Sequence, residues 1–564
     1  MKELAKKTAW LLPFLAAAVL LALQVPWTET LTYQRYDEGY TGCLMTSRAL
    51  GFRLHDDLWI DQPPLFFTLL QTWFRWFGAS LLTGRALVFL LSILFAGLFF
   101  DTIRRRSSPT AAWLALVFLL TRPVYAMMSV TMIQELPAYM FAGLALWLVT
   151  LRSGHKRPRL LLVLSAVSMA CSLLVKLSTA PLVALIAFDL FYCSGRPPGR
   201  PATRLLPIAA WGLIVGLSFA GLGWLMGADF RELVQAHLNP MNTPILPQRS
   251  GARMLPVFVF ANWIPMLLAA PSFVLALRRR EYPFAPPLLW LFLNAVLLNF
   301  YKPVADHYEI HVIVPLCWLA GAALARSVSG RWLALAGCAA LAAIPGNRFM
   351  LRAPTWRVYP DALAAVREYA PRTRWMAAIE CQAYPFIAGV HVIPDLYTTS
   401  LKRMLSGKMS SENTLRQIRQ YRPEQVMMDN AFGYSPELAA YLSGFYRARF
   451  PDNAYMQWVR SDIADPKTRW SSDPLGEAVM ARNEARLRPF EVSAHLLRSG
   501  QPRLAGDILR RALDIRSPAL APWRRDAWGI LGEILRQEGR EAEAQECFRK
   551  AGAPLSSGGA APSY

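Results

Sequence analysis

Ionisable side chains gather in one short stretch, residues 36–65. It reads YDEGYTGCLMTSRALGFRLHDDLWIDQPPL, and it includes Asp37, Glu38 and Asp61 with Arg48 among them. The stretch directly follows an apolar segment that is long enough to cross a bilayer. A carboxylate held where lipid meets water can take a proton from a hydroxyl that attacks an electrophile. Asp37 is therefore a candidate general base, with Glu38 beside it.

A structural interpretation of the same acids stands beside this one. Residues 39–50 are expected to form a short helix on the membrane surface, whose first N–H groups Asp37 would cap while Glu38 complements the helix dipole. A second surface helix is expected over residues 65–77, because tryptophans are typical of the membrane interface. The capping role and the catalytic role can hold together.

Two further ionisable residues lie at the ends of apolar runs. Glu135 opens the run 134–151, where it either answers the helix dipole or serves as a second carboxylate or metal ligand facing Asp37. Lys176 lies in LLVKLSTAPL, and an ionised lysine costs about 2.5–3.5 kcal/mol at mid-bilayer. Lys176 therefore either extends its stem to the headgroups or faces a cavity and a partner.

The stretch YKPVADHYEIHVIVPL adds more polar groups at the start of another apolar run. It contains Lys302, His307 and Tyr308. Contact with a phosphate or a sugar ring is the functional interpretation of Lys302 and His307. Anchoring at the interface explains Tyr308 equally well.

The composition is that of a polytopic membrane protein. Of the 564 residues, 54% are hydrophobic and only 17% are charged, and the net charge of +22 is spread over short basic clusters between apolar runs. No basic surface is interleaved with stacking aromatics, so nucleic acid is not an expected partner. The seven cysteines form no metal-type pair and no disulfide pattern.

About eleven apolar segments are long enough to span a bilayer. Basic residues occupy every second connection, which predicts a cytoplasmic N-terminus and an extracytoplasmic position for everything after residue 347. The first segment lacks a cleavage site and is expected to be retained. The segments are residues 9–27, 84–103, 109–127, 134–151, 159–176, 179–194, 204–226, 254–277, 284–301, 309–326 and 331–346.

Four regions follow from this pattern. Residues 1–347 form the membrane domain, with a long first external loop at residues 28–83. Residues 354–465 alternate helical and strand-like runs and are expected to form a small extracytoplasmic α/β domain. Residues 485–553 contain two similar units that resemble tetratricopeptide helix pairs, and the tail 554–564 is expected to be disordered.

Together these motifs resemble the polyprenyl-phosphate-dependent membrane glycosyltransferases of superfamily C, which include protein O-mannosyltransferases and lipid A aminoarabinose transferases. The resemblance extends over about the first 320 residues. It rests on Asp37-Glu38, Ser47-Arg48-Ala49 and Asp61-Gln62-Pro63-Pro64-Leu65. One departure is Gln62, where relatives often have a lysine, so a phosphate contact made there would come from elsewhere.

The resemblance implies roles for the candidate residues. Asp37 would be the catalytic residue, assisted by Glu38, in an inverting transfer from a polyprenyl-phosphate sugar to an acceptor hydroxyl on a glycan, lipid or protein. The residues expected to hold the donor phosphate are Arg48, Lys176, Lys302 and His307, and those expected on the acceptor side are Glu135, Asp61 and Tyr308. No cofactor is predicted, and the use of a divalent metal stays open.

The expected setting is a bacterial inner membrane, with the C-terminal domain in the periplasm. Membrane lipids are expected partners, and the C-terminal repeats are candidates for binding an envelope protein. No Asp-x-Asp, Gly-x-Gly-x-x-Gly or Walker loop is present, which argues against a nucleotide-sugar enzyme with a metal-held diphosphate and excludes an ATP-driven pump.

Two alternatives from other classes remain. A flippase or transporter of lipid-linked sugars would also place charges among helices, but internal repeats or broken mid-membrane helices would be expected. A non-catalytic scaffold for envelope glycan assembly would use the C-terminal repeats as its working part. Release of polyprenyl phosphate from a labelled lipid-linked sugar by the purified protein distinguishes the enzyme from both.

The orientation is directly testable. A reporter that is active only outside the cytoplasm should be active when fused after residue 360 and silent when fused at Arg105, because the basic loops are retained on the cytoplasmic side. Reporter activity at Arg105 would overturn the predicted placement of the first loop.

Overall fold

A computed structural model describes residues 11–552, except 26, 28–34, 153, 193–200, 234–250, 271–283, 301–303, 328–329, 352–358, 380, 400–402, 404–408, 429–435, 450–455, 472–504, 507–508, 511–512 and 514–520. The chain divides into two compact units. Unit 1 comprises Met1–His237 and Gln248–Arg357, and unit 2 comprises Leu238–Pro247 and Val358–Tyr564.

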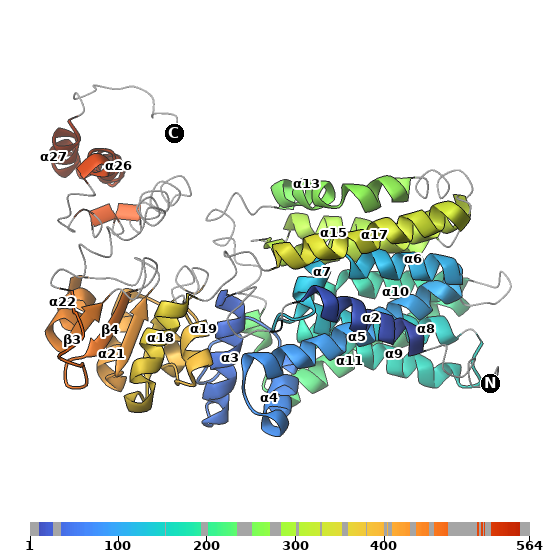
Figure 1. Ribbon diagram of the computed structural model, residues 1–564. Helices are drawn as coiled ribbons and strands as arrows, with labels where there is room; N and C mark the ends of the chain where they lie inside the picture. Colours follow the sequence, from blue (N-terminus) through green and yellow to red (C-terminus); the bar gives the residue numbers. More distant parts are fainter. Residues whose placement is uncertain are drawn as a thin grey trace. The chain divides into compact units, whose positions relative to one another are not determined.

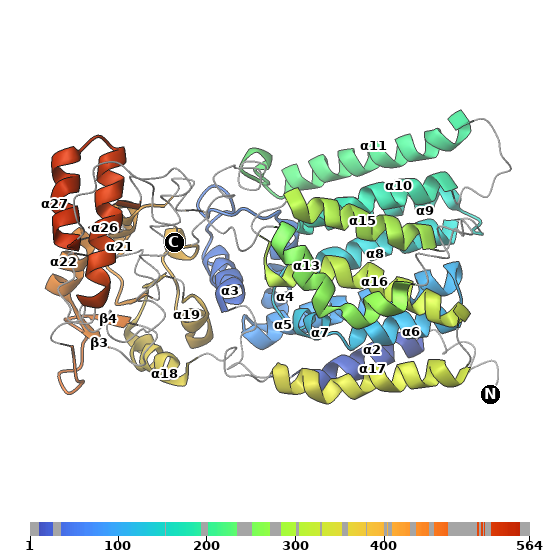
Figure 2. The ribbon, with the colours of Figure 1, turned by 90° about the horizontal axis from the view of Figure 1, so that it is seen from above.

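Unit 1 is helical in all its described elements (Figures 1 and 2). The short helices α3 (Arg35–Ala49) and α4 (Leu65–Phe77) lie between α2 (Leu12–Gln24) and α5 (Leu81–Arg106) in the chain, and most of the longer helices run side by side. The others are α6 (Pro109–Leu120), α7 (Pro123–Met128), α8 (Glu135–Arg152), α9 (Pro158–Val175), η2 (Leu177–Thr179), α10 (Pro181–Tyr192), α11 (Pro201–Leu225), α13 (Gly251–Ala261), α15 (Ala285–Phe300), η6 (Asp306–Glu309), α16 (Ile310–Ser327) and α17 (Gly330–Met350).

Several of these helices are long and apolar enough to cross a membrane. Within the described residues, four pass a test of length and hydropathy, and a bent pair, Arg253–Ala261 with Trp263–Ala270, makes a fifth if it is one span. The four are Leu81–Arg106, Pro158–Val175, Leu205–Leu225 and Asp306–Arg326. Shorter apolar helices add to the same unit. The count of about eleven spans stays a prediction from the sequence.

Local sequence explains where key helices begin and end. Ser80 caps α5 by accepting the Thr83 N–H, and Ser108 caps α6, whose first residue is proline. The last turn of α5 holds Arg104, Arg105 and Arg106, where the helix dipole favours cations.

Small and polar residues fix the packing between helices of unit 1. A Cβ added to Gly321 of α16 would lie 2.6 Å from the Ala111 carbonyl oxygen of α6, so only glycine permits this close approach. Asn347 of α17 donates to Gln24 Oε1 of α2 at 2.8 Å and to the Thr121 carbonyl at 2.7 Å. These buried bonds tie α17 to α2 and to the end of α6.

Unit 2 contains a four-stranded sheet in the order β1-β2-β4-β3. The strands are β1 (Met376–Ile379), β2 (Gln425–Met428), β3 (Tyr446–Arg449) and β4 (Met456–Arg460). Strands β1 and β2 are parallel, and the other two pairings are antiparallel. The helices are α18 (Pro360–Tyr369), η8 (Ala370–Arg372), α19 (Ala383–Ala388), η9 (Pro394–Leu396), α21 (Ser411–Tyr421) and α22 (Pro436–Phe445).

Within the region 354–465, where alternating helical and strand-like runs are expected, the structure thus has the helices α18 and α21 and the strands β1 and β2. The extracytoplasmic placement of this region stays a prediction.

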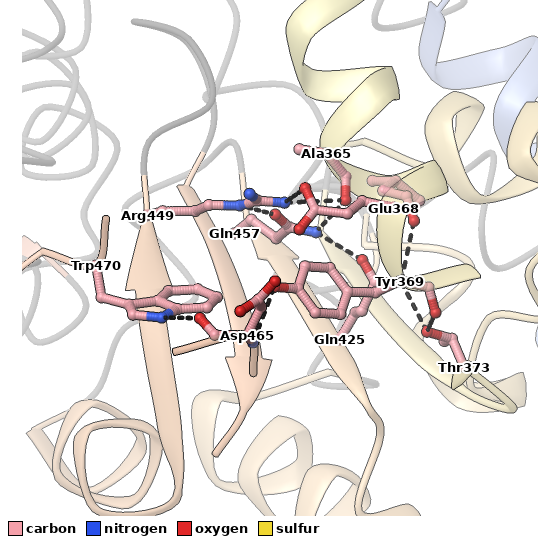
Figure 3. A network of polar contacts seen from close by, with 10 residues as sticks. Ala365, Glu368, Tyr369, Thr373, Gln425, Arg449, Gln457, Asp465 and Trp470 are labelled. Carbon is pink, nitrogen blue, oxygen red and sulfur yellow. Dashed lines mark hydrogen bonds and ion pairs between the residues drawn. The ribbon is translucent and has the colours of Figure 1, made fainter. Parts of the chain in front are cut away.

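A polar network fastens α18 to this sheet (Figure 3). Arg449 donates to Gln457 Oε1 at 2.7 Å and to Glu368 Oε2 at 2.9 Å, and its guanidinium lies 5.3 Å from the Tyr369 ring centroid. Gln457 in turn donates to Gln425 Oε1 at 2.6 Å. Because these side chains are bonded to one another, we interpret the network as structural.

The end of the chain forms helices α26 (Ala521–Gln537) and α27 (Glu541–Ala551). A Cβ added to Gly532 of α26 would lie 2.7 Å from the Phe548 ring of α27, so glycine allows that ring to approach. Ala505 and Leu509 share a buried apolar cluster with Ala544. Much of residues 485–520 and the tail 554–564 lie outside the described residues, so the tetratricopeptide-like repeat stays a prediction.

Candidate active site

Asp37 lies in the first turn of α3, where its charge also complements the helix dipole. Four ionisable residues act on its carboxyl from other segments: His307, Glu135, Lys176 and Asp61. Burial raises the pKa of Asp37, and Glu135 and Asp61 also raise it, whereas His307 and Lys176 lower it. Residues far apart in the sequence thus meet around Asp37.

Glu135 bonds to both Lys176 and His307 in this cluster. It begins α8, is 1% exposed, and accepts hydrogen bonds from the Lys176 ammonium and, at 3.1 Å, from His307 Nε2. Its second oxygen, Oε2, and Nδ1 of His307 have no hydrogen-bond partner among the described residues. A buried polar atom without a partner is unfavourable, so a ligand with polar groups would be stabilised here.

Lys176 reaches the cluster because the helix ends just before it. Helix α9 stops at Val175, Lys176 is extended, and the single turn η2 follows before α10 begins at Pro181. The freed carbonyl of Lys176 accepts from Thr179 Oγ1 at 3.0 Å. Backbone groups in a broken membrane helix need such partners. The boundary expected between the apolar segments 159–176 and 179–194 is therefore present.

The Lys176 side chain is buried and paired, with only 4% of the residue exposed. This position favours the cavity-facing interpretation over one in which the stem extends to the headgroups.

The ring of Tyr308 lies against both Lys176 and His307. The Lys176 ammonium lies 5.0 Å from the Tyr308 ring centroid, and His307 and Tyr308 stack at 4.8 Å. His311 stacks in turn on Tyr308, and its Nδ1 lies 2.7 Å from Tyr139 OH. Aromatic faces attract cations and exclude water, which strengthens the local electrostatics.

Sequence reasoning missed Tyr139 and His311. Each lies four residues after a predicted site residue, Glu135 or His307, and helical spacing of four places side chains on one face. That spacing was the signal that could have found them.

Glu38 has a different environment from its neighbour Asp37. It is buried and receives two bonds from Arg85 of α5, from Nε at 2.9 Å and from Nη2 at 2.7 Å. The Met132 N–H also donates to it at 3.1 Å. Such a carboxylate is fully engaged, so its place indicates a positioning role for α3 rather than proton transfer.

The other residues predicted for the site are Asp61, Arg48 and Lys302. Asp61 lies near Asp37 and accepts from Gln62 Nε2 at 3.3 Å. Arg48 donates to Thr68 Oγ1 of α4 at 3.4 Å, and is not among the groups that most affect the Asp37 pKa. Lys302 lies outside the described residues. In the described part of the chain, no group of three or more His, Cys, Asp or Glu is arranged to hold a metal ion.

Comparisons with known proteins bear on this arrangement. Residues 61–224 match the family described as dolichyl-phosphate-mannose-protein mannosyltransferase. The crystal structure of ArnT from Cupriavidus metallidurans in the apo state is similar, with a TM-score of 0.60 and 14% identity over 82% of this chain and 100% of that chain.

The same protein bound to undecaprenyl phosphate gives a TM-score of 0.53 and 16% identity over the same shares, 82% and 100%. No curated protein sequence matches the chain. The resemblance predicted from the first loop is confirmed, because the family match includes Asp61, Glu135 and Lys176 and the fold is that of a solved relative.

The Glu38–Arg85 pair gives a stability prediction. Arg85→Met should lower the free energy of unfolding by about 3–5 kcal/mol, because it leaves a buried carboxylate without its cation. The double variant Glu38→Met/Arg85→Met should recover most of the loss, since both charges are then removed. Denaturation of the detergent-solubilised protein measures both.

Arg53→Gln is the matched control, because Arg53 forms only exposed ion pairs, with Asp56 at 3.1 Å and Asp57 at 3.4 Å. It should change stability by at most about 1 kcal/mol. An Arg85→Met variant as stable as this control would contradict the positioning role of the pair.

Proposed function

We propose that this chain, which has the fold of the superfamily C membrane glycosyltransferases, moves a sugar from a polyprenyl-phosphate donor to an acceptor hydroxyl on the extracytoplasmic side. The observation that carries the proposal is the cluster in which Asp37 meets Lys176, His307 and Glu135. It combines a candidate base with cations suited to a phosphate.

Asp37 is the general base of this reaction. The acceptor hydroxyl gives its proton to the Asp37 carboxylate while its oxygen attacks the first carbon of the sugar. The bond from that carbon to the phosphate oxygen breaks, and the polyprenyl phosphate leaves with the electron pair. Attack from the back side inverts the anomeric centre. Burial raises the pKa of Asp37, which makes its carboxylate a stronger base than an exposed aspartate.

Lys176 and His307 stabilise the charge that grows on the leaving phosphate. Both already bond to Glu135, so a donor phosphate would share these cations with Glu135 or replace it. The unpartnered Nδ1 of His307 offers a further bond when that nitrogen is protonated. In a buried site such contacts are stronger than in water.

Glu135 and Asp61 complete the acceptor side of the proposal. The free Oε2 of Glu135 can accept a hydrogen bond from a sugar or acceptor hydroxyl. Tyr308 would cover the reacting groups with its ring. Lys302 is retained as a second donor contact by the sequence resemblance alone.

The setting belongs to the same proposal. The enzyme lies in a bacterial inner membrane, with the N-terminus cytoplasmic and residues after 347 in the periplasm. Residues 354–465 and the helices near the end of the chain then face the envelope. There they would meet the acceptor, a glycan, lipid or protein, or an envelope protein partner.

Replacing Asp37 tests the chemistry. Asp37→Asn should lower the rate of transfer by about 10²–10⁴-fold, because the amide keeps the shape of the side chain but cannot take the proton. Release of polyprenyl phosphate from a labelled donor measures the rate, and donor affinity should stay near that of the wild type.

The pH profile of the wild type sharpens this test. A base must be ionised to act, so kcat/KM should rise with pH through a midpoint above the ordinary aspartate range, since the pKa of Asp37 is raised. A fully active Asp37→Asn variant would leave Asp37 only the role of complementing the helix dipole, since α3 begins at Arg35 and Asp37 lies inside its first turn rather than before it as a cap.

Replacing Lys176 tests the donor site. Lys176→Met should weaken donor binding by about 1.5–3 kcal/mol, or roughly tenfold to more than a hundredfold, because a charge-assisted bond to the phosphate is lost. Lys176→Arg should rescue only partly, since its forked group is bulkier. Donor titration of the purified protein gives these affinities.

The exposed Lys156 supplies the control for charge alone, and Lys156→Met should leave donor affinity unchanged. Lys176→Met alone takes a cation away from the buried Glu135 carboxylate, and the double variant Lys176→Met/Glu135→Gln also removes that carboxylate's charge. If the double variant regained wild-type donor affinity, the loss would have come from that carboxylate, and Lys176 would not hold the phosphate.

A further inference from the structure

A pair of arginines lies on the helices of the first loop, apart from the cluster around Asp37. Arg48 is in the last turn of α3, and Arg75 is in the last turn of α4. Their charges act on one another: burial lowers the pKa of Arg48, and Arg75 lowers it further. Among the described residues, neither has a carboxylate partner.

Another arginine of the same loop does have carboxylate partners. Arg53, close by in sequence, forms ion pairs with Asp56 and Asp57. Two cations that repel one another gain from a shared anion, because it removes the repulsion and accepts hydrogen bonds from both. The Arg48–Arg75 pair therefore has the charge of an anion site.

Helix α4 adds hydroxyls to the same place. Thr68, Thr72 and Arg75 follow one another at helical spacings of four and three, which puts them on one face. Arg48 reaches that face through its bond to Thr68 Oγ1 at 3.4 Å. Thr68 Oγ1 donates to the Pro64 carbonyl at 3.1 Å and Thr72 Oγ1 to the Thr68 carbonyl at 2.9 Å, so the two forked guanidiniums supply the donors for the oxygens of a phosphate.

Apolar side chains border this polar face. Trp76 is 73% exposed and Phe77 is 58% exposed, although the opposite side of α4 is buried through Phe66, Leu70 and Phe74. Exposed tryptophan beside arginine is the composition of a helix that lies in the membrane interface. The anion that fits is thus amphiphilic, with a phosphate head and an apolar body.

We propose that Arg48 and Arg75 bind the headgroup phosphate of an anionic phospholipid at the membrane surface. This site goes beyond the proposed function, because donor phosphate belongs with Lys176 and His307. It also assigns Arg48 to the membrane rather than to the donor. Since Arg48 and Asp37 are on one short helix, a lipid bound at the end of α3 would hold the catalytic carboxylate at the level of the headgroups.

Lipid binding to the purified full-length protein tests the proposal. Fluorescent phosphatidylglycerol and phosphatidylcholine of equal chain length are titrated into the detergent-solubilised protein. Phosphatidylglycerol should bind more tightly, and Arg48→Gln and Arg75→Gln should each weaken it about fivefold. Added salt should reduce the preference in the wild type, because exposed charges are screened.

Two controls separate this site from other effects. Arg53→Gln removes a nearby but paired arginine and should leave the affinity for phosphatidylglycerol unchanged. Lys176→Met should also leave it unchanged, while it weakens polyprenyl-phosphate donor binding.

Three outcomes overturn the proposal. Equal binding of both lipids by the wild type would show that charge is not recognised. Unchanged affinity in Arg75→Gln would exclude the pair, and because the Arg75 side chain is exposed, a loss of affinity in that variant would not come from misfolding. A loss of donor binding in Arg48→Gln without a loss of phosphatidylglycerol binding would return Arg48 to the donor site.

Discussion

The buried carboxylate of Glu135 is the constraint around which the candidate site is arranged. A charge away from water needs partners, and Glu135 obtains them from Lys176 and His307. These three residues come from the start of α8, the break after α9 and the turn η6. Neutralising one charge thus brings together three segments, and the first turn of α3 adds Asp37 to them.

A second buried pair serves the geometry rather than the chemistry. Glu38 follows Asp37 directly, and its bonds to Arg85 and to the Met132 N–H hold the first turn of α3 against α5 and the residues before α8. Adjacent acids in one helical turn therefore have separate tasks. Glu38 is held in an ion pair, and Asp37 lies among Lys176, His307 and Glu135.

The buried polar atoms without hydrogen-bond partners indicate where a ligand could bind in the site. Glu135 Oε2 and His307 Nδ1 lie within the same cluster, where a ligand with polar groups would give them partners. The protein then has two anion sites in our proposals, a buried one for the donor at Lys176 and a lipid-facing one at Arg48 in the first loop.

The sequence by itself determined the class of fold and most of the candidate residues, because apolar length, basic loops and the Asp37-Glu38 motif are local features. It also indicated the break after Lys176, since Ser, Thr and Pro interrupt a helical run there. Only the tertiary structure decided which residues meet. It gave Glu38 a different partner from Asp37, brought Arg48 of α3 to Thr68 of α4, and added Tyr139 and His311. The reason is physical: pairing of buried charges depends on contacts between segments that lie from about forty to more than a hundred and fifty residues apart, which no local pattern records.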